Sequence, residues 1–378
     1  MEDQKSIQKD TQYPNLKLAV NWLINSGIQA ENGAFYAWYD CEKNEYSFLY
    51  PEITGYSISL LLQLYRLMND EIFLRRAILA GEWLLEIQRK DGSFYCKFFD
   101  TTMEYKKYDS SRYTFDAAIC VSGLVDLFNA TFDVKFLRAA EKTGNWLVRH
   151  QNQDGSFLAG ISPDGENIEE YHWSRMSSCH HLKIVISLLK MHKILQRKKF
   201  FISAKKLLRW AQKFQTVTGE FLISSKSEQV YTHANNYAIE GLLKASEFFN
   251  DTSLLKNAVH GAKRLSKMQN DDGSVWNYYN SERNKIKVSD ATAQALRIWL
   301  ILNEKGVPFF STNVDKGFEF LGKLQCLSEN VHASGGIYYG QQMSNKIMHV
   351  NSWATIFTIQ ALMFKQKKEN PSSISLLF

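Results

Sequence analysis

The sequence predicts an all-α fold, an (α/α)6 barrel in which six helical hairpins form a closed ring, and three observations predict it. A short turn containing glycine recurs six times, about 60 residues apart. Each turn follows a segment with apolar residues at helical spacing, and a second helical segment, apolar on most faces, comes after it. One hairpin cannot bury its own apolar face, whereas six in a ring can, so the repeat favours one ring over several domains.

The turns share a glycine and a preceding glutamine. They are "IQAENGAF", "IQRKDGSF", "HQNQDGSF", "FQTVTGEF", "MQNDDGSV" and "LQCLSENVHASGGIYY", with Gly33, Gly92, Gly155, Gly219, Gly273 and either Gly335 or Gly336. A glycine after the last apolar residue of a helix is typical of a left-handed C-terminal cap. The glutamine amide is expected to tie the end of its helix to a neighbour.

The helices divide into two sets. Amphipathic segments such as 73–88, 136–151 and 254–269 are expected to form the outer layer. The more apolar segments are expected inside, and they are 55–67, 117–128, 182–195, 236–249, 291–303 and 352–364. The barrel is predicted to fill 13–366, with 13–26 beside the last hairpin. Residues 1–12 are predicted to be a disordered or extended segment and 367–378 a C-terminal tail.

The composition excludes several classes of protein. The chain has 378 residues, of which 45% are hydrophobic and 22% charged, as is usual for a soluble globular protein. The sequence contains no run of 18 apolar residues, so no membrane span is predicted, and the polar N-terminus does not have the pattern of a signal peptide. Five scattered cysteines favour reduced thiols and a cytoplasmic location. A net charge of +6 without a dense basic cluster gives no support for nucleic-acid binding.

No cofactor or metal is predicted. The sequence lacks GxGxxG, P-loop and GxSxG motifs. The "CHH" at 179–181 could ligate a metal, but no second pair of ligands has suitable spacing.

The segments between the turns and the inner helices predict where function lies. They are long and rich in Tyr, Ser and Asn, and all of them must crowd one mouth of the barrel. Polar residues stand just before every inner helix, namely Glu52, Asp116, His180 with His181, His233, Asp290 and Asn351. Acids and amides are common helix N-caps, but histidine is not, so capping explains this set poorly.

These positions suggest acid–base chemistry. Glu52 and Asp116 could act as general acid and base around a glycosidic bond. His181 and His233 could instead move a proton on and off a sugar carbon. The remaining candidates would bind substrate by stacking, by ion pairing with a carboxylate or by hydrogen bonds from the funnel, and they are Trp38, Tyr108, Arg112, Trp173, Arg175, His180, Asn236, Tyr237, Trp276, Asp290 and Asn351.

The motifs resemble two groups of proteins. "AGEWLLEIQRKDGSF" is similar to the QW repeats of the squalene cyclase and prenyltransferase superfamily, although the DxDD motif and the zinc ligands of those enzymes are absent. "PEITGY", "TFDAA" and the "DGSF" turns resemble the six-hairpin sugar enzymes. Similarity to the unsaturated glucuronyl hydrolases implies catalytic acids at Glu52 and Asp116, although those hydrolases have Asp at the first position. Similarity to the N-acylglucosamine 2-epimerases implies catalytic His181 and His233.

The sequence thus predicts a carbohydrate-active enzyme that acts on a sugar or a uronate-containing glycan in polysaccharide metabolism. Hydrolysis, epimerisation and elimination all stay open, as does the oligomeric state. One alternative is an isoprenoid cyclase or prenyltransferase-like enzyme, which an aromatic funnel with one isolated acid would favour. Another is a non-catalytic glycan-binding barrel, in which the polar residues all serve as helix caps.

Overall fold

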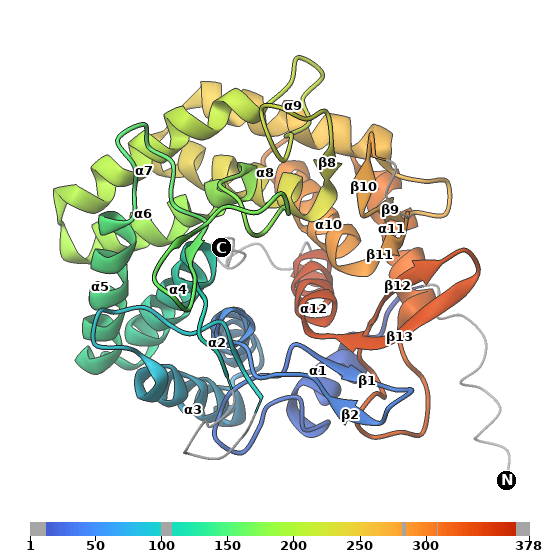
Figure 1. Ribbon diagram of the computed structural model, residues 1–378. Coiled ribbons are helices and arrows are strands. Elements are labelled where there is room, and N and C mark those ends of the chain that lie inside the picture. The colour runs from blue at the N-terminus through green and yellow to red at the C-terminus, as the bar shows by residue number, and fades with distance from the viewer. Residues whose placement is uncertain (1–12, 100–107, 282–284, 308, 368–378) are drawn as a thin grey trace, which may run out of the picture.

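The computed structural model describes residues 13–99, 108–281, 285–307 and 309–367, and its helices form two concentric rings (Figure 1). The inner ring comprises α2 (Pro51–Met68), α4 (Thr114–Thr131), α6 (Ile184–Leu195), α8 (Thr232–Phe249), α10 (Ser289–Glu304) and α12 (Ser352–Lys367). The outer ring comprises α1 (Leu16–Asn25), α3 (Glu71–Ile87), α5 (Val134–Arg149), α7 (Lys198–Ala211), α9 (Thr252–Met268) and α11 (Ser311–Leu324). Two 3-10 turns, η1 (Cys179–Lys183) and η2 (Gln212–Phe214), precede α6 and follow α7. The predicted (α/α)6 barrel is confirmed.

The ring closes between the first and the last hairpin. Helix α12 packs against α10, α2 and α1, as predicted for the segment 13–26. The Tyr13 hydroxyl donates to Asp315 Oδ1 at 2.8 Å, and Trp22 Nε1 donates to the carbonyl of His332 at 2.9 Å. The predicted N-terminal segment 1–12 and residues 368–378 of the predicted tail lie outside the described residues, whereas Lys367 belongs to α12.

The recurring glutamine links each hairpin to the next, as predicted. Gln151 Nε2 donates to the carbonyl of Gly155 in its own turn and to the carbonyl of Ser203 in α7, both at 3.0 Å. Equivalent pairs of bonds are made by Gln29, Gln215, Gln269 and Gln325, while Gln88 bonds Ala139 and Thr143 in α5. Gln325 reaches the carbonyl of Asn15, the residue that caps α1, at 3.0 Å. The sixth link therefore returns to the start of the barrel.

The turn glycines have a different role from the predicted helix cap. Helix α9 ends at Met268, whereas Gly273 lies in a separate turn in which its N–H donates to Asn270 at 2.9 Å. Its φ is +89°, and a Cβ there would stand 1.9 Å from the carbonyl oxygen of Lys316 in α11. In the sixth turn Gly335, with φ +94°, is the left-handed residue. Each turn needs glycine both for its backbone and for its close approach to the next outer helix.

Gly273→Ala is expected to lower the melting temperature much more than Gly165→Ala. The two glycines have nearly the same φ, +89° and +91°, so the cost of a left-handed alanine is matched. A Cβ at Gly165 meets nothing within 4 Å, whereas a Cβ at Gly273 collides with the backbone of α11. Thermal unfolding of the two variants measures the difference. Equal melting temperatures would contradict the role of the turn in joining hairpins.

The segments at the mouth form short strands, which the sequence analysis did not predict. They are β1 (Trp38–Asp40), β2 (Glu45–Tyr46), β3 (Lys97–Phe98), β4 (Tyr108–Asp109), β5 (Arg112–Tyr113), β6 (Gly160–Ile161), β7 (Asn167–Ile168), β8 (Val230–Tyr231), β9 (Val275–Trp276), β10 (Tyr278–Tyr279), β11 (Lys287–Val288), β12 (Tyr338–Gln342) and β13 (Asn345–Asn351). The largest sheet, in the order β2-β1-β13-β12-β11-β9, joins the first hairpin to the fifth and sixth. Strands β1 and β13 lie side by side (Figure 1) and place Trp38 opposite Asn351.

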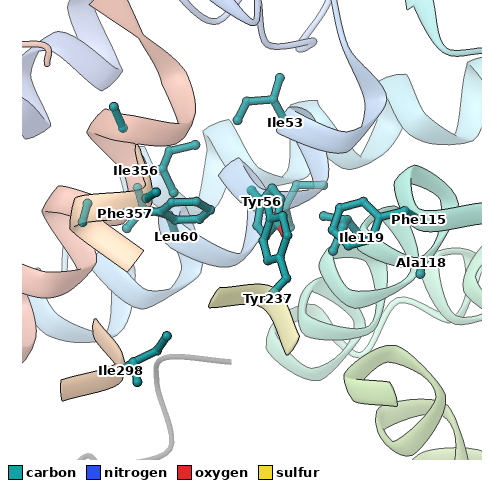
Figure 2. Close-up of a cluster of buried hydrophobic side chains, with 14 of the residues drawn as sticks. Ile53, Tyr56, Leu60, Phe115, Ala118, Ile119, Tyr237, Ile298, Ile356 and Phe357 are labelled. Atoms are coloured by element: carbon teal, nitrogen blue, oxygen red, sulfur yellow. The ribbon is translucent and has the colours of Figure 1, made fainter. Parts of the chain in front are cut away.

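The centre of the barrel is filled by side chains from the inner helices (Figure 2). The rings of Tyr56 and Tyr237 are nearly parallel, with centroids 6.4 Å apart. Further along α8, the fully buried Glu240 contacts Lys183 Nζ, and its Oε1 lies 3.2 Å from Arg297 Nη1. This buried cluster joins η1, α8 and α10. Removing one partner would leave an uncompensated charge, so it fixes those elements relative to each other.

Candidate active site

A cavity of about 450 Å³ opens at the mouth of the barrel, where the inner helices begin. Residues from the first turns of α2, α4, α8, α10 and α12, from η1 and from the mouth strands surround it. They are Trp38, Phe48, Tyr50, Glu52, Lys97, Phe115, Asp116, Trp173, Ser174, His180, Tyr231, His233, Asp290, Tyr339, His349, Asn351 and Trp353. The sequence prediction of a polar funnel with aromatic walls thus has a counterpart in one described cavity.

The acids and His233 lie within the first turns of their helices, whereas the sequence analysis placed them just before the helices. The N-cap positions of α2, α4, α8 and α10 are Tyr50, Tyr113, Tyr231 and Val288, and none makes a side-chain capping bond. The carboxylates of Glu52 and Asp116 therefore do not sit at the capping position. Asn351 differs, because its Oδ1 accepts from the N–H of Ala354 at 2.9 Å and so caps α12.

Glu52 and Asp116 form a buried carboxyl pair. Trp353 Nε1 donates to Glu52 Oε1 at 3.1 Å, and the Tyr50 hydroxyl donates to Asp116 Oδ2 at 2.9 Å. Burial raises the pKa of both carboxyls well above the usual range, and the charge of Asp116 raises that of Glu52 further. The pair therefore holds protons at much higher pH than free carboxylic acids do.

His180, His233 and Asp290 line the same cavity as the carboxyl pair. His233 Nδ1 lies 3.5 Å from Asp290 Oδ2. Burial lowers the pKa of His233 to about 3 and that of His180 well below its usual value, so both rings are neutral at pH 7. Burial also raises the pKa of Asp290 to about 7. These neutral imidazoles can accept a proton or hydrogen-bond a hydroxyl.

His180, and not the predicted His181, shares the cavity with His233. The two adjacent rings have centroids 4.3 Å apart, but of these two only His180 lines the described cavity. Both nitrogens of His180 are buried without a hydrogen-bond partner in the described part of the chain. His181 is fully buried and is not part of the described lining. The 3-10 geometry of η1 decides which of the two rings faces the mouth, and a sequence motif does not specify that geometry.

Aromatic rings form two walls. Trp173 stacks on Tyr231 with centroids 4.5 Å apart. Trp38 stacks on His349 at 5.6 Å, across the sheet that joins the first and last hairpins. Flat apolar surfaces of this kind fit the faces of sugar rings.

Two predicted residues on α8 lie below the cavity rather than on its wall. Asn236 is fully buried, and its Nδ2 donates to the carbonyl of Ala291 at 2.9 Å, which ties α8 to α10. Tyr237 packs at the barrel centre (Figure 2), and its ring centroid lies 4.5 Å from that of His233. Both are thus placed to support the helix that carries His233.

Three predicted residues lie on the rim, outside the described lining. Tyr108 is 46% exposed and stacks on Tyr95 at 4.7 Å. Arg112 Nη1 lies 3.6 Å from Asp91 Oδ2, and Trp276 lies under the ammonium of Lys287 at 5.5 Å.

A second cavity of about 350 Å³ adjoins the first and contains Arg175. The two cavities share Tyr50, Lys97, Asp116 and Ser174, and the second is completed by Cys96, Asp109, Tyr113, Glu170, His172 and Arg175. Its walls are mostly polar.

Sequence reasoning missed about half of the first cavity's lining, namely Phe48, Tyr50, Lys97, Phe115, Ser174, Tyr231, Tyr339, His349 and Trp353. Tyr50 and Tyr231 directly precede inner helices, so extending the search by two residues along the chain would have found them. Lys97 and His349 reach the cavity through strand pairing, which leaves no clear signal in the sequence.

The melting temperature is expected to fall as the pH rises from 6.5 to 8.5. The pKa values of Glu52, Asp116 and Asp290 are higher in the folded state than in the unfolded state, where they lie near 4. Their contribution to stability is therefore fully present below about pH 4 and is lost as the pH rises through the folded-state pKa values. His233 acts oppositely, since its pKa is lowered, but that contribution is complete above about pH 6.5. Asp290→Asn should reduce the fall by about 1 °C. An identical fall in wild type and variant would contradict the raised pKa of the buried Asp290.

Comparisons with known proteins identify the fold. No protein-family model and no curated protein sequence matches the chain. Among solved structures, a sugar epimerase from a ruminal bacterium has a TM-score of 0.74 at 13% identity, covering 92% of this chain and 96% of its own. A cellobiose 2-epimerase from Bacillus thermoamylovorans gives 0.74 at 13%, covering 89% and 93%. An unsaturated glucuronyl hydrolase specific for heparin gives 0.70 at 13%, covering 94% and 96%.

The likeness is one of fold. It confirms the resemblance to the six-hairpin sugar enzymes at the level of architecture, over nearly the whole chain. Within the described residues, no helix is both long and apolar enough to cross a membrane.

Proposed function

We propose that the protein is a carbohydrate-active enzyme that hydrolyses a glycosidic bond with Glu52 and Asp116. The observation that carries the proposal is this carboxyl pair, which projects from successive inner helices into one cavity and whose pKa values are raised by burial. A glycosidase needs one carboxyl protonated and one ionised, and raised values allow this near neutral pH. The neighbouring structures, a sugar epimerase and a glucuronyl hydrolase among them, support a sugar substrate.

The surroundings of the pair suit this chemistry. Tyr50 and Trp353 hold the two carboxyls by hydrogen bonds, so neither has to be repositioned during reaction. The stacked Trp173 and Tyr231 would hold a sugar ring across the cavity. Asp290, His180 and His233, which line the same cavity, would bond its hydroxyls.

Epimerisation is the second candidate, because His180 and His233 are neutral and face the same cavity. A neutral imidazole could remove a proton from a sugar carbon and return it on the other face. Asp290, 3.5 Å from His233, would stabilise the imidazolium that forms. Elimination from a uronate would use the same bases and is the third possibility within this class.

Two other classes have less support. An isoprenoid cyclase would suit an aromatic funnel with one isolated acid, whereas this cavity holds three carboxyls and several histidines. A non-catalytic binding barrel would have its polar residues at capping positions, and Glu52, Asp116 and His233 are not there. We place the protein in the cytoplasm, because all five cysteines are free thiols.

One set of assays separates the three reactions. Purified protein is incubated in D₂O with a panel of disaccharides and uronate-containing oligosaccharides. Hydrolysis releases new reducing ends without deuterium on the sugar carbons. Epimerisation incorporates deuterium with the glycosidic bond intact, and elimination yields an unsaturated uronate that absorbs in the ultraviolet. Deuterium incorporation without new reducing ends would replace hydrolysis with the histidine mechanism.

A further inference from the structure

We infer that the substrate spans two sugar subsites, with the glycosidic bond held at Asp116 between the two cavities. This rests on the proposed hydrolysis. Among the described residues that line the two cavities, Asp116 is the carboxyl common to both, whereas Glu52 lines only the first. A general acid must reach the oxygen between two sugar units. Asp116 occupies that boundary, and Glu52 faces the unit inside the barrel mouth.

The second cavity has the chemistry of a site for an uncharged sugar. Besides Asp116, its charged groups are two cations, Lys97 and Arg175, and two carboxylates, Asp109 and Glu170. Arg175 Nη1 lies 2.8 Å from Glu170 Oε2, so donor and acceptor stand side by side. Sugar hydroxyls both donate and accept hydrogen bonds, which matches such a pair. The carboxylate of a uronate would gain little binding energy here, because the two cations and the two carboxylates of the wall balance each other.

One loop before η1 supplies the boundary between the subsites. Trp173 lines the first cavity, Arg175 lines the second, and Ser174 lines both. The loop is folded tightly on itself, because the N–H of Glu170 donates to the carbonyl of Arg175 and the N–H of Arg175 donates to that of His172, both at 2.9 Å. Neighbouring side chains are thus held toward different sugar units.

The residues give a balanced reaction. The two neighbouring carboxyls share one proton, and in the reactive state this proton lies on Asp116 while Glu52 is ionised. As the bond from the anomeric carbon to the bridging oxygen breaks, the Asp116 carboxyl transfers its proton to that oxygen, and the sugar in the second cavity leaves as an alcohol. Water adds its oxygen to the anomeric carbon, and its proton passes to the Glu52 carboxylate. Proton exchange with solvent restores the starting state. One water is consumed and two sugars are formed.

The test uses two substrates that differ only in the second subsite. One is the disaccharide that the wild type cleaves fastest among cellobiose, maltose and their counterparts with glucuronate at the non-reducing end. The other is the glycosyl fluoride of its non-reducing unit, which has no second sugar and a leaving group that needs little acid assistance. We expect Arg175→Ala to lower kcat/KM on the disaccharide about 10-fold or more, which is the usual loss for a hydrogen bond to a charged group. The factor lost on the fluoride should be at least ten times smaller. Trp173→Ala should lower both by similar factors.

Asp116→Asn provides an independent arm. Turnover of the disaccharide should fall by about 10²-fold or more, whereas the fluoride should lose far less. Arg209→Ala, an exposed arginine on α7 that lines neither cavity, is the matched control and should change neither rate. Equal effects of Arg175→Ala on the two substrates, or equal effects of Asp116→Asn, would overturn the assignment.

Binding distinguishes failure of the inference from failure of the proposed function. If the wild type cleaves no substrate, hydrolysis is wrong, and calorimetric titration with cellobiose and with glucose then tests the subsites alone. Two subsites require cellobiose to bind more tightly than glucose and Arg175→Ala to remove the difference. No preference for cellobiose would end the two-subsite inference as well.

Discussion

Glu52→Gln and Asp116→Asn will each lower turnover by roughly 10²-fold or more while leaving the barrel folded, since general acid–base catalysis contributes about that factor. Each replacement keeps the shape of the side chain but removes the proton that the carboxyl gives or takes. The hydrogen bonds from Trp353 and Tyr50 can still be accepted by the amide oxygen. Both variants relieve a buried pair of repelling acids, so their melting temperatures at pH 8 should equal or exceed that of the wild type.

Asp126→Asn is the matched control for these variants. It lies on α4, the helix of Asp116, where it bonds Lys190 at 2.8 Å and Ser59 at 2.8 Å, outside the lining of the described cavities. It should keep full turnover with at most a small loss of stability. Turnover and thermal unfolding are measured on the same preparations. Full activity in both site variants would end the two-carboxyl mechanism and leave the fold assignment untouched.

Deleting residues 352–378 will abolish cooperative unfolding of the whole protein. Helix α12 completes the inner ring between α10 and α2, and Ile356, Phe357 and Ile359 on it are fully buried. Burying each such side chain contributes about 1.5–3 kcal/mol, and α12 carries several, against a total stability of about 5–15 kcal/mol. Its loss also exposes the apolar faces of both neighbours, which favours aggregation.

Deleting only residues 368–378 is the control, because it leaves α12 whole. Calorimetry and near-ultraviolet circular dichroism compare the two truncations with the full chain. The shorter deletion should melt as the full chain does. If the longer deletion did so too, the closed ring could not be the basis of stability.

The sequence predicts most of the fold because the repeat reports packing directly. Gln29, Gln151 and their equivalents each bond a neighbouring outer helix, so the same residue is needed at the same place in each hairpin. The turn glycine recurs for a similar reason. At Gly273 it is the close contact with α11 that requires glycine, and not a helix cap. In these turns the residues that form the recurring sequence pattern are the same ones that contact the neighbouring outer helix.

The site was predicted less completely, because its members meet through contacts that periodicity does not encode. Glu52, Asp116, His233 and Asp290 were found because they occupy equivalent places at the inner helix starts. The choice of His180 over His181 depends on one short 3-10 turn. The positions of His349 and Lys97 in the lining depend on strand register. Arg112 and Tyr108 lie outside the lining, where they contact Asp91 and Tyr95.

The hydrogen bond from Trp353 to Glu52 joins residues 301 positions apart and has a consequence for how the protein is made. Ribosomes add about 5–20 residues per second, so Glu52 is synthesised on the order of 15–60 s before the indole that holds it. Through that interval the nascent chain carries the acid without Trp353, His349 or Asn351 around it. A chain released early therefore has no finished cavity, and the lining of the cavity is complete only once the last helix has been made.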